Sequence, residues 1–375
     1  MDINEFLFEL EGLVNIDTGS TDCHDGIDKV ASYFEERFKA LGWQTNKCDL
    51  SPDAGPTLVC TNREAEVYDL MMIGHIDTVF LKGTAEKRPF KTDGEFAYGP
   101  GVGDMKQGAL LMYYLIKEMP REVLDKLNIV VVFNSDEELG SLASRRAYEE
   151  YAKRTRYAFI YEGATIDGAC CAERKGGLGY SVSFEGVAGH CGFVFTNGAK
   201  SAVHEMARWI VELTDMQSEE RGTSVNVGVV KGGYKSNVVA PEAEMLVDIR
   251  VLDNSEPEKF DKKIEELTKA ASERGIGVKV SRRFKPAFVY SDKVREYVSH
   301  VEKIASEAKI PFTHRMRGGL SDANIIAQWG ALCLDGLGPE AGGGHSDEEK
   351  MRISSVDRMY KLSRLLISDL AKNKS

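Results

Sequence analysis

The chain has 375 residues, of which 42% are hydrophobic and 29% are charged, and its formal net charge is −11. This composition is typical of an ordinary globular protein, with enough length for one large domain or two moderate ones. The negative charge is spread along the sequence, which argues against nucleic-acid and anionic-membrane partners, and no apolar run reaches the roughly 18 residues of a membrane span.

The first half of the sequence alternates between helical and extended patterns. Apolar residues recur with the 3.6-residue period in the first 20 residues and again over residues 27–41, which predicts two helices. The next predicted strands are residues 57–61, 68–74, 127–134 and 157–161, and the next predicted helices are residues 106–119 and 141–154. Because these strands are too apolar to face water, we expect an α/β fold with a mostly parallel sheet flanked by helices.

The pattern changes after residue 174. Half-exposed strands are predicted at residues 180–185, 224–231, 244–252 and 278–283, and amphipathic helices at residues 201–214 and 258–274. Beyond residue 286 the first pattern returns, with predicted helices at residues 292–308 and 323–329, a strand at residues 331–334 and a last helix from Ser355. We therefore expect one domain (residues 1–174 and 287–375) interrupted by an inserted α+β open-sandwich domain (residues 175–286).

Acidic and histidine side chains follow three of the apolar strands. His75 and Asp77 end one strand, Glu137 and Glu138 follow the next in the stretch VVFNSDEELG, and Glu162 follows the last. Each motif alone has a plain structural interpretation, such as a strand-end turn or an acidic helix cap. Together they point to one site, because open α/β sheets place their sites at the carboxyl ends of their strands.

Two glycine-rich loops add further candidate ligands. Asp104 lies in YGPGVGDMKQG, where it is either a metal ligand or the N-cap of the following helix, and His345 lies in GGGHSDE. Two imidazoles with several carboxylates suit zinc, cobalt or manganese better than calcium, which prefers oxygen ligands. One carboxylate between two ions, with two further ligands for each ion, describes a two-metal hydrolytic site.

The motifs GHIDT, GVGDMKQGAL, NSDEELGS, YEGA and GHSDEEK follow one another in an order that identifies a family. The chain resembles the carboxypeptidase G / acetylornithine deacetylase / succinyl-diaminopimelate desuccinylase superfamily of two-zinc peptidases and deacylases over nearly its full length. Its motifs are most similar to those of the carboxypeptidase G-like branch. The resemblance implies a metal-binding catalytic domain, a lid and dimerisation domain at residues 175–286, and five metal ligands: His75, Asp104, Glu138, Glu162 and His345.

The resemblance also implies individual roles. Asp104 would lie between the two ions and be followed by a cis peptide bond, Asp77 would orient His75, and Glu137 would be the general base. Asp136 is expected to face solvent or to cap the next helix. His190, which by its residues alone is an ordinary strand-end histidine, would polarise the scissile carbonyl across a dimer interface.

Further positions match substrate-holding residues of the family. They are Asn237, Arg250, Lys285, Gly319 and Ser321. The chain also departs from the family pattern, because Gln107 stands where DMKGG would place a glycine; we interpret this as a packing change that leaves metal ligation intact. Glu162, where many members carry aspartate, and the basic Lys285 favour a carboxypeptidase acting on a substrate with an acidic terminus.

The expected function is hydrolysis of an amide bond in a small peptide or N-acyl amino acid with a free carboxylate. Two divalent ions, zinc before cobalt or manganese, and a homodimer formed through the lid domain are expected. Alternatives are a di- or tripeptide aminopeptidase or an N-acyl-amino-acid deacylase of the same superfamily, or a catalytically idle, metal-stabilised dimeric binding protein. Seven scattered cysteines without framework spacing indicate reduced thiols in the cytoplasm, and a secreted protein without its leader is the alternative.

Overall fold

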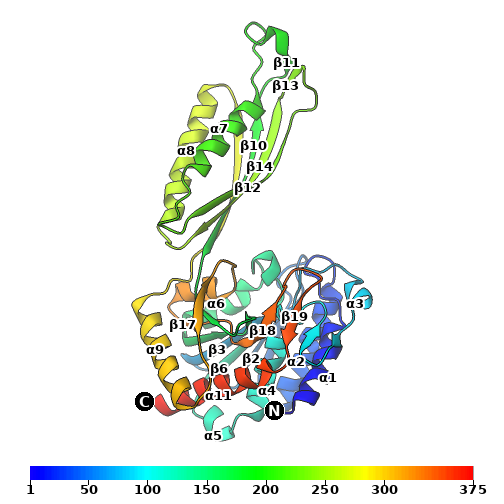
Figure 1. Ribbon diagram of the computed structural model, residues 1–375, viewed down its shortest axis with the longest axis vertical. Coiled ribbons are helices and arrows are strands. Elements are labelled where there is room, and N and C mark those ends of the chain that lie inside the picture. Colours follow the sequence, from blue (N-terminus) through cyan, green and yellow to red (C-terminus); the bar gives the residue numbers. More distant parts are fainter. Residues whose placement is uncertain (375) are drawn as a thin grey trace. The chain divides into compact units, whose positions relative to one another are not determined.

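The computed structural model describes residues 1–374, and the chain divides into two compact units. Unit 1 holds Met1–Glu173, Tyr290–Arg317 and Ser321–Ser375, and unit 2 holds Arg174–Val289 and Gly318–Leu320. Figure 1 labels the elements of both units. Unit 2 is thus an insertion in the sequence of unit 1.

Unit 1 contains a six-stranded sheet. Its strands, in spatial order, are β1 (Gln44–Cys48), β2 (Thr57–Thr61), β6 (Ile129–Asn134), β3 (Tyr68–His75), β7 (Thr155–Ile160) and β17 (Leu332–Leu334). The last four of these are parallel to one another, whereas β2 runs antiparallel to β6 and β1 runs antiparallel to β2. The expected α/β class with a mostly parallel sheet is confirmed. The edge strand β1 was not expected, because its sequence QTNKC is polar.

Helices cover this sheet and form the core of unit 1. They are α1 (Ile3–Val14), α2 (His24–Ala40), α3 (Thr84–Lys87), α4 (Lys106–Glu118), α5 (Arg121–Leu124), α6 (Arg145–Lys153), α9 (Asp292–Glu307), α10 (Ala323–Ile326) and α11 (Ser355–Asn373), with the 3-10 turns η1 (Glu137–Leu139) and η3 (Ala327–Trp329). The strands β3 and β6 are buried along their whole length. The ring of Phe34 on α2 stacks on Phe133 of β6 with a centroid distance of 4.2 Å.

Unit 1 also contains a second, five-stranded sheet, which contacts α4 through β18. It comprises β4 (Lys91–Thr92), β5 (Phe96–Tyr98), β19 (Lys350–Arg352), β18 (Gly338–Gly342) and β8 (Gly163–Thr165), and a separate pair is formed by β9 (Cys170–Arg174) and β16 (His314–Arg317). These strands are too short to leave a periodic pattern, so the sequence did not predict them. Helix α4 contacts β3, β18, α1 and α11, which explains why every residue from Lys106 to Ile116 is buried.

Two predicted helices differ from the observed ones. The helix expected at residues 141–154 begins only at Arg145, because Ser141 has a φ of 57° and the backbone turns before entering α6. The helix expected at residues 323–329 is α-helical to Ile326 and continues as the tighter η3 turn.

Unit 2 is an antiparallel sheet with helices packed on one of its faces. Its elements are β10 (Gly176–Glu185), β11 (Gly189–His190), η2 (Cys191–Phe193), α7 (Ala202–Thr214), β12 (Ser224–Gly232), β13 (Val238–Val239), β14 (Glu242–Val251), α8 (Glu256–Glu273) and β15 (Gly277–Lys285). The main sheet has the order β12-β14-β10-β15, and β11 pairs with β13 beyond its end (Figure 1). The ring of Trp209 on α7 packs edge-on against Phe184 of β10, with a centroid distance of 5.2 Å.

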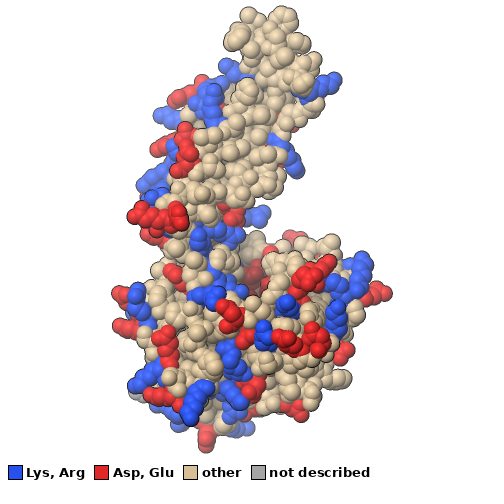
Figure 2. Space-filling model, viewed as in Figure 1, with Lys and Arg blue, Asp and Glu red and all other residues tan. Residues whose placement is uncertain are grey.

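Acidic and basic side chains are interspersed over the visible surface of each unit (Figure 2). The end of unit 2 that carries β11 shows neither kind in this view, and Phe195 there is 98% exposed. None of the helices in residues 1–374 combines the length and the apolar character that a membrane span requires. All seven cysteines are free thiols, and five of them are buried.

Candidate metal centre

Three neighbouring parallel strands bring candidate ligands to one edge of the six-stranded sheet. His75 is the last residue of β3, Glu138 lies in the η1 turn after β6, and Glu162 follows β7. Two loops add the remaining candidates, since Asp104 precedes α4 and His345 lies between β18 and β19. Because β6, β3 and β7 are adjacent and parallel, their carboxyl ends share the same edge.

Close packing of α4 against the strand that precedes Glu162 helps to bring these residues together. A Cβ atom at Gly108 would lie only 1.9 Å from the carbonyl oxygen of Tyr161. Glycine at this helix position therefore lets α4 approach the backbone beside Glu162. Asp104, just before the same helix, is carried to the strand end by this approach.

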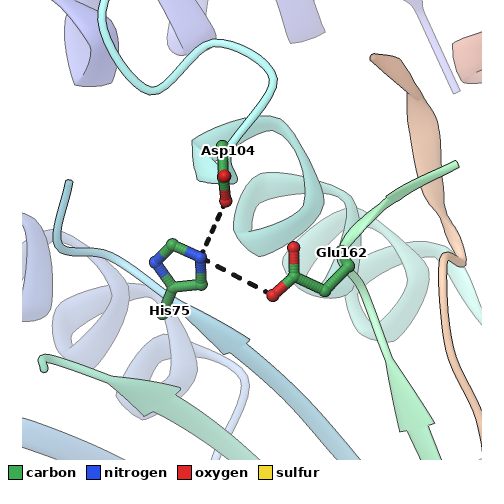
Figure 3. Close-up of side chains that lie close together, drawn as sticks. All are labelled: His75, Asp104 and Glu162. Atoms are coloured by element: carbon green, nitrogen blue, oxygen red, sulfur yellow. Dashed lines mark hydrogen bonds and ion pairs between the residues drawn. The ribbon is translucent and has the colours of Figure 1, made fainter. Parts of the chain in front are cut away.

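The first group of ligand atoms comes from His75, Asp104 and Glu162, whose side chains point toward one another (Figure 3). His75 Nε2 lies 3.0 Å from Asp104 Oδ1 and 3.7 Å from Glu162 Oε1. The His75 side chain is 2% exposed and the Glu162 side chain is 13% exposed. One imidazole nitrogen and two carboxylates thus face a common point in a largely buried place.

The second group shares Asp104 with the first. His345 Nε2 lies 3.2 Å from Asp104 Oδ2 and 3.2 Å from Glu138 Oε2. The left-handed backbone of His345, with a φ of 63°, follows three glycines. In each group the ligand atoms all lie within 4.8 Å of one another. Each oxygen of Asp104 therefore serves a different group, which is the arrangement that a bridging carboxylate requires.

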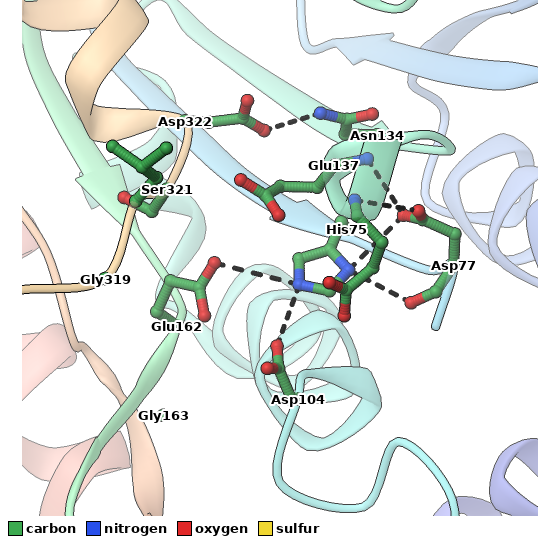
Figure 4. Close-up of polar contacts among 12 residues, drawn as sticks. His75, Asp77, Asp104, Asn134, Glu137, Glu162, Gly163, Gly319, Ser321 and Asp322 are labelled. Atoms are coloured by element: carbon green, nitrogen blue, oxygen red, sulfur yellow. Dashed lines mark hydrogen bonds and ion pairs between the residues drawn. The ribbon is translucent and has the colours of Figure 1, made fainter. Parts of the chain in front are cut away.

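Asp77 connects His75 with the η1 turn (Figure 4). The Nδ1 atom of His75 lies 3.0 Å from the backbone oxygen of Asp77 and 3.3 Å from its Oδ1. The same carboxylate accepts hydrogen bonds from the backbone nitrogens of Glu137 at 3.2 Å and Glu138 at 3.1 Å, and from the Ser20 hydroxyl at 2.7 Å. Asp77 thus orients the imidazole and also holds the turn that carries Glu137 and Glu138. No sequence signal pointed to Ser20.

Asp136, the first acid of VVFNSDEELG, is buried, with 2% of its surface exposed. Its carboxylate accepts hydrogen bonds from the backbone nitrogens of Ala143 at 2.7 Å and Ser144 at 3.1 Å, directly before α6. The expectation that Asp136 faces solvent is wrong, and Asp136 is not the cap of the next α-helix either, because the N-cap of α6 is Ser144; its carboxylate instead holds the backbone that leads into this helix.

The loop that carries Asp104 is held by a residue that the sequence did not single out. Glu349 is 1% exposed and accepts hydrogen bonds from three backbone nitrogens of this loop. The run Asp347-Glu348-Glu349, which repeats the three-acid pattern of Asp136 to Glu138, was the available signal. The peptide bond between Asp104 and Met105 is cis, as the resemblance implied, and the alternative role of Asp104 as a helix cap is wrong, because Met105 occupies that position.

The electrostatics of the centre favour positive charge. Burial works to lower the pKa of His75, but its hydrogen bonds to Asp104 and Asp77 prevail and raise that pKa well above its usual value. Hydrogen bonds to Asp104 and Glu138 raise the pKa of His345 to about 10. Burial raises the pKa of Asp104, yet the hydrogen bonds from His345 and His75 outweigh it and lower this pKa well below its ordinary range.

The donor set fits divalent metal ions. Three carboxylates and two imidazoles converge there, and these carboxylates attract a proton to both imidazoles. Divalent ions such as zinc bind the same nitrogen and oxygen donors and would take the place of those protons. The Asp77 contact with His75 Nδ1 leaves Nε2 as the ligand atom.

Ser321 and Asp322 lie at the start of α10 in unit 1. The Ser321 hydroxyl donates to Asp335 at 2.8 Å, and its backbone nitrogen donates to the Asn324 side chain at 3.0 Å. The Asp322 carboxylate accepts hydrogen bonds from three buried side chains: Asn134 at 2.6 Å, Ser141 at 2.5 Å and Tyr148 at 3.0 Å. The donors of Ser321 are thus used within the protein, and Asp322 fixes the end of β6 (Figure 4).

Unit 2 brings its predicted site residues together in two separate groups. His190 and Asn237 lie together, since His190 pairs with Val238 and the backbone nitrogen of Cys191 donates to the Asn237 carbonyl at 3.1 Å. Arg250 and Lys285 lie on either side of Gly177 in the main sheet. Gly319 belongs to the second group, because a Cβ atom at Gly177 would lie 2.9 Å from the neighbouring Leu320.

Comparisons with known proteins agree on one family. A model of peptidase family M20/M25/M40 matches residues 71–369. Carboxypeptidase G2 from Pseudomonas sp. is 30% identical over 372 residues, which are 97% of this chain and 89% of that protein. Succinyl-diaminopimelate desuccinylase from Xanthomonas oryzae pv. oryzae is 25% identical over 329 residues, which are 80% of this chain and 83% of that protein.

The fold is also that of a solved structure. The aminopeptidase PepT from Bacillus cereus matches with a TM-score of 0.79 at 21% identity, over 99% of each chain. This likeness concerns the fold. The family model and the relatives cover most of the chain. The structure contains two groups of acidic and histidine side chains that could hold metal. The chain therefore belongs to peptidase family M20/M25/M40 and is a metallopeptidase-type hydrolase.

Proposed function

We propose that the protein uses two divalent metal ions to hydrolyse an amide bond in a small peptide or N-acyl amino acid with a free carboxylate. The observation that carries this proposal is the position of Asp104, whose two carboxylate oxygens face two different ligand groups. His75 and Glu162 would complete one ion's shell, and Glu138 and His345 the other. Zinc is the expected ion, with cobalt or manganese as substitutes.

Glu137 is the proposed general base. When bound, the ions would supply Lewis acidity that polarises a carbonyl group and makes a nearby water molecule more acidic. A carboxylate oxygen of Glu137 then accepts the proton of the attacking water and delivers it to the leaving nitrogen. The position of Glu137 supports this role, because its neighbour Glu138 belongs to the second ligand group and its backbone nitrogen is held by Asp77.

The second group in unit 2 supports a substrate with a negative terminus. Arg250 and Lys285 are the residues paired with Gly177 on the two neighbouring strands, so two cationic residues lie on either side of a position that has no side chain. We propose that they bind the free carboxylate of the substrate, with the Gly319 loop beside them. The similarity to carboxypeptidase G2 agrees with this proposal, since a carboxypeptidase acts at a carboxyl terminus.

His190 and Asn237 are proposed to serve the active site of a second copy of the chain. Gly177 and Glu185, at opposite ends of β10, are about 27 Å apart at 3.4 Å per residue, and β11 lies beyond the Glu185 end (Figure 1). An extended dipeptide spans about 7 Å. One small substrate therefore cannot contact both groups of one unit 2. A homodimer removes this conflict, because each copy can donate His190 and Asn237 to the other.

The lid surface supports such a dimer. β12 is an edge strand of the main sheet, and it exposes Val229 and Val230. Val211 on α7 is 59% exposed. An open strand edge beside exposed valines is a suitable interface for strand pairing. We also propose a cytoplasmic location, which the seven free thiols support.

The test is an assay with N-blocked and free-amine dipeptides and N-acyl amino acids, run on metal-free protein restored with zinc, cobalt or manganese. We expect N-blocked substrates with a free carboxylate to be hydrolysed and their carboxyl amides to be resistant. Cleavage confined to free-amine peptides would indicate an aminopeptidase instead. No hydrolysis of any substrate by the metal-loaded protein would support the idle binding protein, although an acid in the position of Glu137 argues against it.

A further inference from the structure

The segment between β5 and α4 presents Asp104, and two buried side chains that are not ligands hold this segment. Glu349 accepts hydrogen bonds from the backbone nitrogens of Gly101 at 3.1 Å, Gly103 at 2.8 Å and Asp104 at 2.9 Å. Gln107 donates a hydrogen bond from Nε2 to the carbonyl oxygen of Gly103 at 2.8 Å. The backbone of Gly103 is therefore held at its nitrogen by one side chain and at its oxygen by the other.

Both side chains are shielded from water. Glu349 is 1% exposed and Gln107 is 0% exposed. A buried hydrogen bond has no water to replace it, so the loss of either side chain leaves backbone groups of the loop without partners. Two glycines leave room for the Gln107 amide. A Cβ atom added at Gly338 would lie 2.9 Å from Gln107 Oε1, and one added at Gly163 would lie 3.3 Å from Gln107 Nε2.

Gln107 is a feature of this chain and not of the family pattern, which has glycine at this position. A glycine has no side chain with which to hold the Gly103 carbonyl. The sequence alone suggested a packing change without effect on the metal ligands. The structure instead places the Gln107 amide on the backbone directly before Asp104.

We propose that Glu349 and Gln107 are positioning residues that fix the direction of the Asp104 carboxylate and thereby set the affinity of both metal ions together. This inference rests on the proposed two-ion function. Glu349 binds the backbone nitrogen of Asp104 itself, and the two oxygens of Asp104 face the two ligand groups. A change in the loop therefore acts on both ion sites, whereas the loss of a ligand such as His345 acts on one.

The test measures the affinity of purified full-length protein for Zn²⁺ by calorimetry and records the visible absorption spectrum of the cobalt-loaded protein. Four variants are compared with the wild type: Glu349→Gln, Gln107→Met, His345→Ala and, as a matched control, Glu348→Gln, which changes the exposed neighbour of Glu349. Met keeps the approximate size of Gln but cannot donate a hydrogen bond. Circular dichroism establishes that each variant is folded.

We expect Glu349→Gln to lower the affinity for both ions in parallel by about 10–100-fold, as the replacement of residues that support metal ligands does. The visible spectrum of the cobalt-loaded variant should also shift. Gln107→Met, which removes one hydrogen bond, should lower the affinity for both ions by about 3–10-fold. His345→Ala should lower the affinity for one ion only, and Glu348→Gln should have the affinities and the spectrum of the wild type.

Unchanged affinities and spectra in folded Glu349→Gln, or a loss confined to one ion, would overturn the inference while leaving the two-ion centre intact. If Glu349→Gln does not fold, Gln107→Met decides, and wild-type affinity in that variant overturns the inference. A wild-type chain that binds no divalent ion overturns the metal centre itself and the positioning role with it.

Discussion

The Oδ2 atom of Asp77 lies 3.1 Å from the backbone nitrogen of Glu138, so one buried carboxylate connects the end of β3 with the turn after β6. The other oxygen of Asp77 receives the backbone nitrogen of Glu137 and lies near the His75 imidazole. Asp77 belongs to neither group of proposed ligands. It nevertheless determines where two proposed ligands and the proposed base are placed.

Replacement of Asp77 by asparagine should therefore weaken metal binding. Asparagine offers one acceptor oxygen in place of two and directs an NH₂ group at the backbone donors of the η1 turn. We expect a loss of zinc affinity of about 10–100-fold, measured by calorimetry, with a parallel loss of turnover. Asp28→Asn, which removes only a half-exposed ion pair with Lys47, is the control. Wild-type affinity in Asp77→Asn would show that the turn is held by other contacts.

Glu137→Gln should separate metal binding from catalysis. The glutamine keeps the size and the backbone contact of Glu137 but cannot accept the proton of water. Turnover should fall by about 10²–10⁴-fold while the metal content, measured by plasma mass spectrometry, stays at the wild-type level. A variant with near-native turnover would exclude Glu137 as the base, and a variant without metal would make it a ligand.

The ligand groups predict metal stoichiometries. His345→Ala leaves the group of His75, Asp104 and Glu162 intact, so the protein should keep one of the two proposed ions after gel filtration. Asp104→Asn affects both groups and should lose both ions. Asp347→Asn, beside His345 with its side chain 87% exposed, is the control and should keep both. A protein that loses one ion on substitution of Asp104 would not have a bridging aspartate.

Mixed dimers test whether His190 acts on the partner's site. His190→Ala and Glu137→Gln should each be inactive when pure. If each copy donates its histidine to the other, an equilibrated equal mixture contains hybrid dimers with one intact site, and turnover should recover to about a quarter of the wild-type value. A mixture of Glu137→Gln with Glu137→Gln/His190→Ala is the control without an intact site. Failure of the first mixture to recover, with subunit exchange shown by native mass spectrometry, would place His190 in its own chain's site.

A buried carboxylate in unit 2, paired with a partly exposed arginine, predicts a pH-dependent stability. Glu205 is 1% exposed, and it receives Arg274 Nε at 2.7 Å and the Trp209 indole at 3.2 Å. Burial raises the pKa of Glu205, but the hydrogen bonds from Arg274 outweigh burial and leave it below its usual value of 4.5. A carboxylate whose pKa is lower in the folded state than in the unfolded state stabilises the fold at pH values above its unfolded-state pKa. This stabilisation is lost as the pH falls through its folded-state pKa.

Glu205→Gln should therefore cost about 1–3 kcal/mol in urea unfolding at pH 7, followed by tryptophan fluorescence. The difference from the wild type should shrink as the pH falls below 4.5 and through the lowered pKa of the wild-type carboxylate. Glu212→Gln, which removes a half-exposed pair with Lys263, should show little cost at either pH. An equal cost for Glu205→Gln at both pH values would rule out this linkage.

The sequence predicted the parts of the fold that have strong periodicity. The central strands β3 and β6 and the helices α2 and α4 were evident, because buried runs and amphipathic periods are long there. The five-stranded sheet was missed, because strands of two to five residues carry no period. The helix expected at residues 141–154 begins late, at Arg145, because Ser141 has a positive φ, and a positive φ at serine has no signature in sequence.

The candidate ligands were evident in the sequence because each stands next to a strand end or a glycine-rich loop. Their supporting residues were less evident. Asp136 and Glu349 are acids that bind backbone nitrogens, and nothing in an acidic run tells which member will be buried. Ser20 and Gln107 act through contacts far along the chain or across a loop, which only the folded structure reveals.

The position of β18 and β19 late in the sequence has a consequence for the synthesis of the protein. Asp104, Glu138 and Glu162 are translated well before residues 338–352, which carry His345 and Glu349 and fill the gap between β5 and β8. Until this segment leaves the ribosome, the nascent chain has clustered acids, one imidazole and an unfinished sheet. A premature stop before this segment would thus remove the histidine of the second ligand group and the sheet's middle strands at once, leaving a chain for quality-control proteases to degrade.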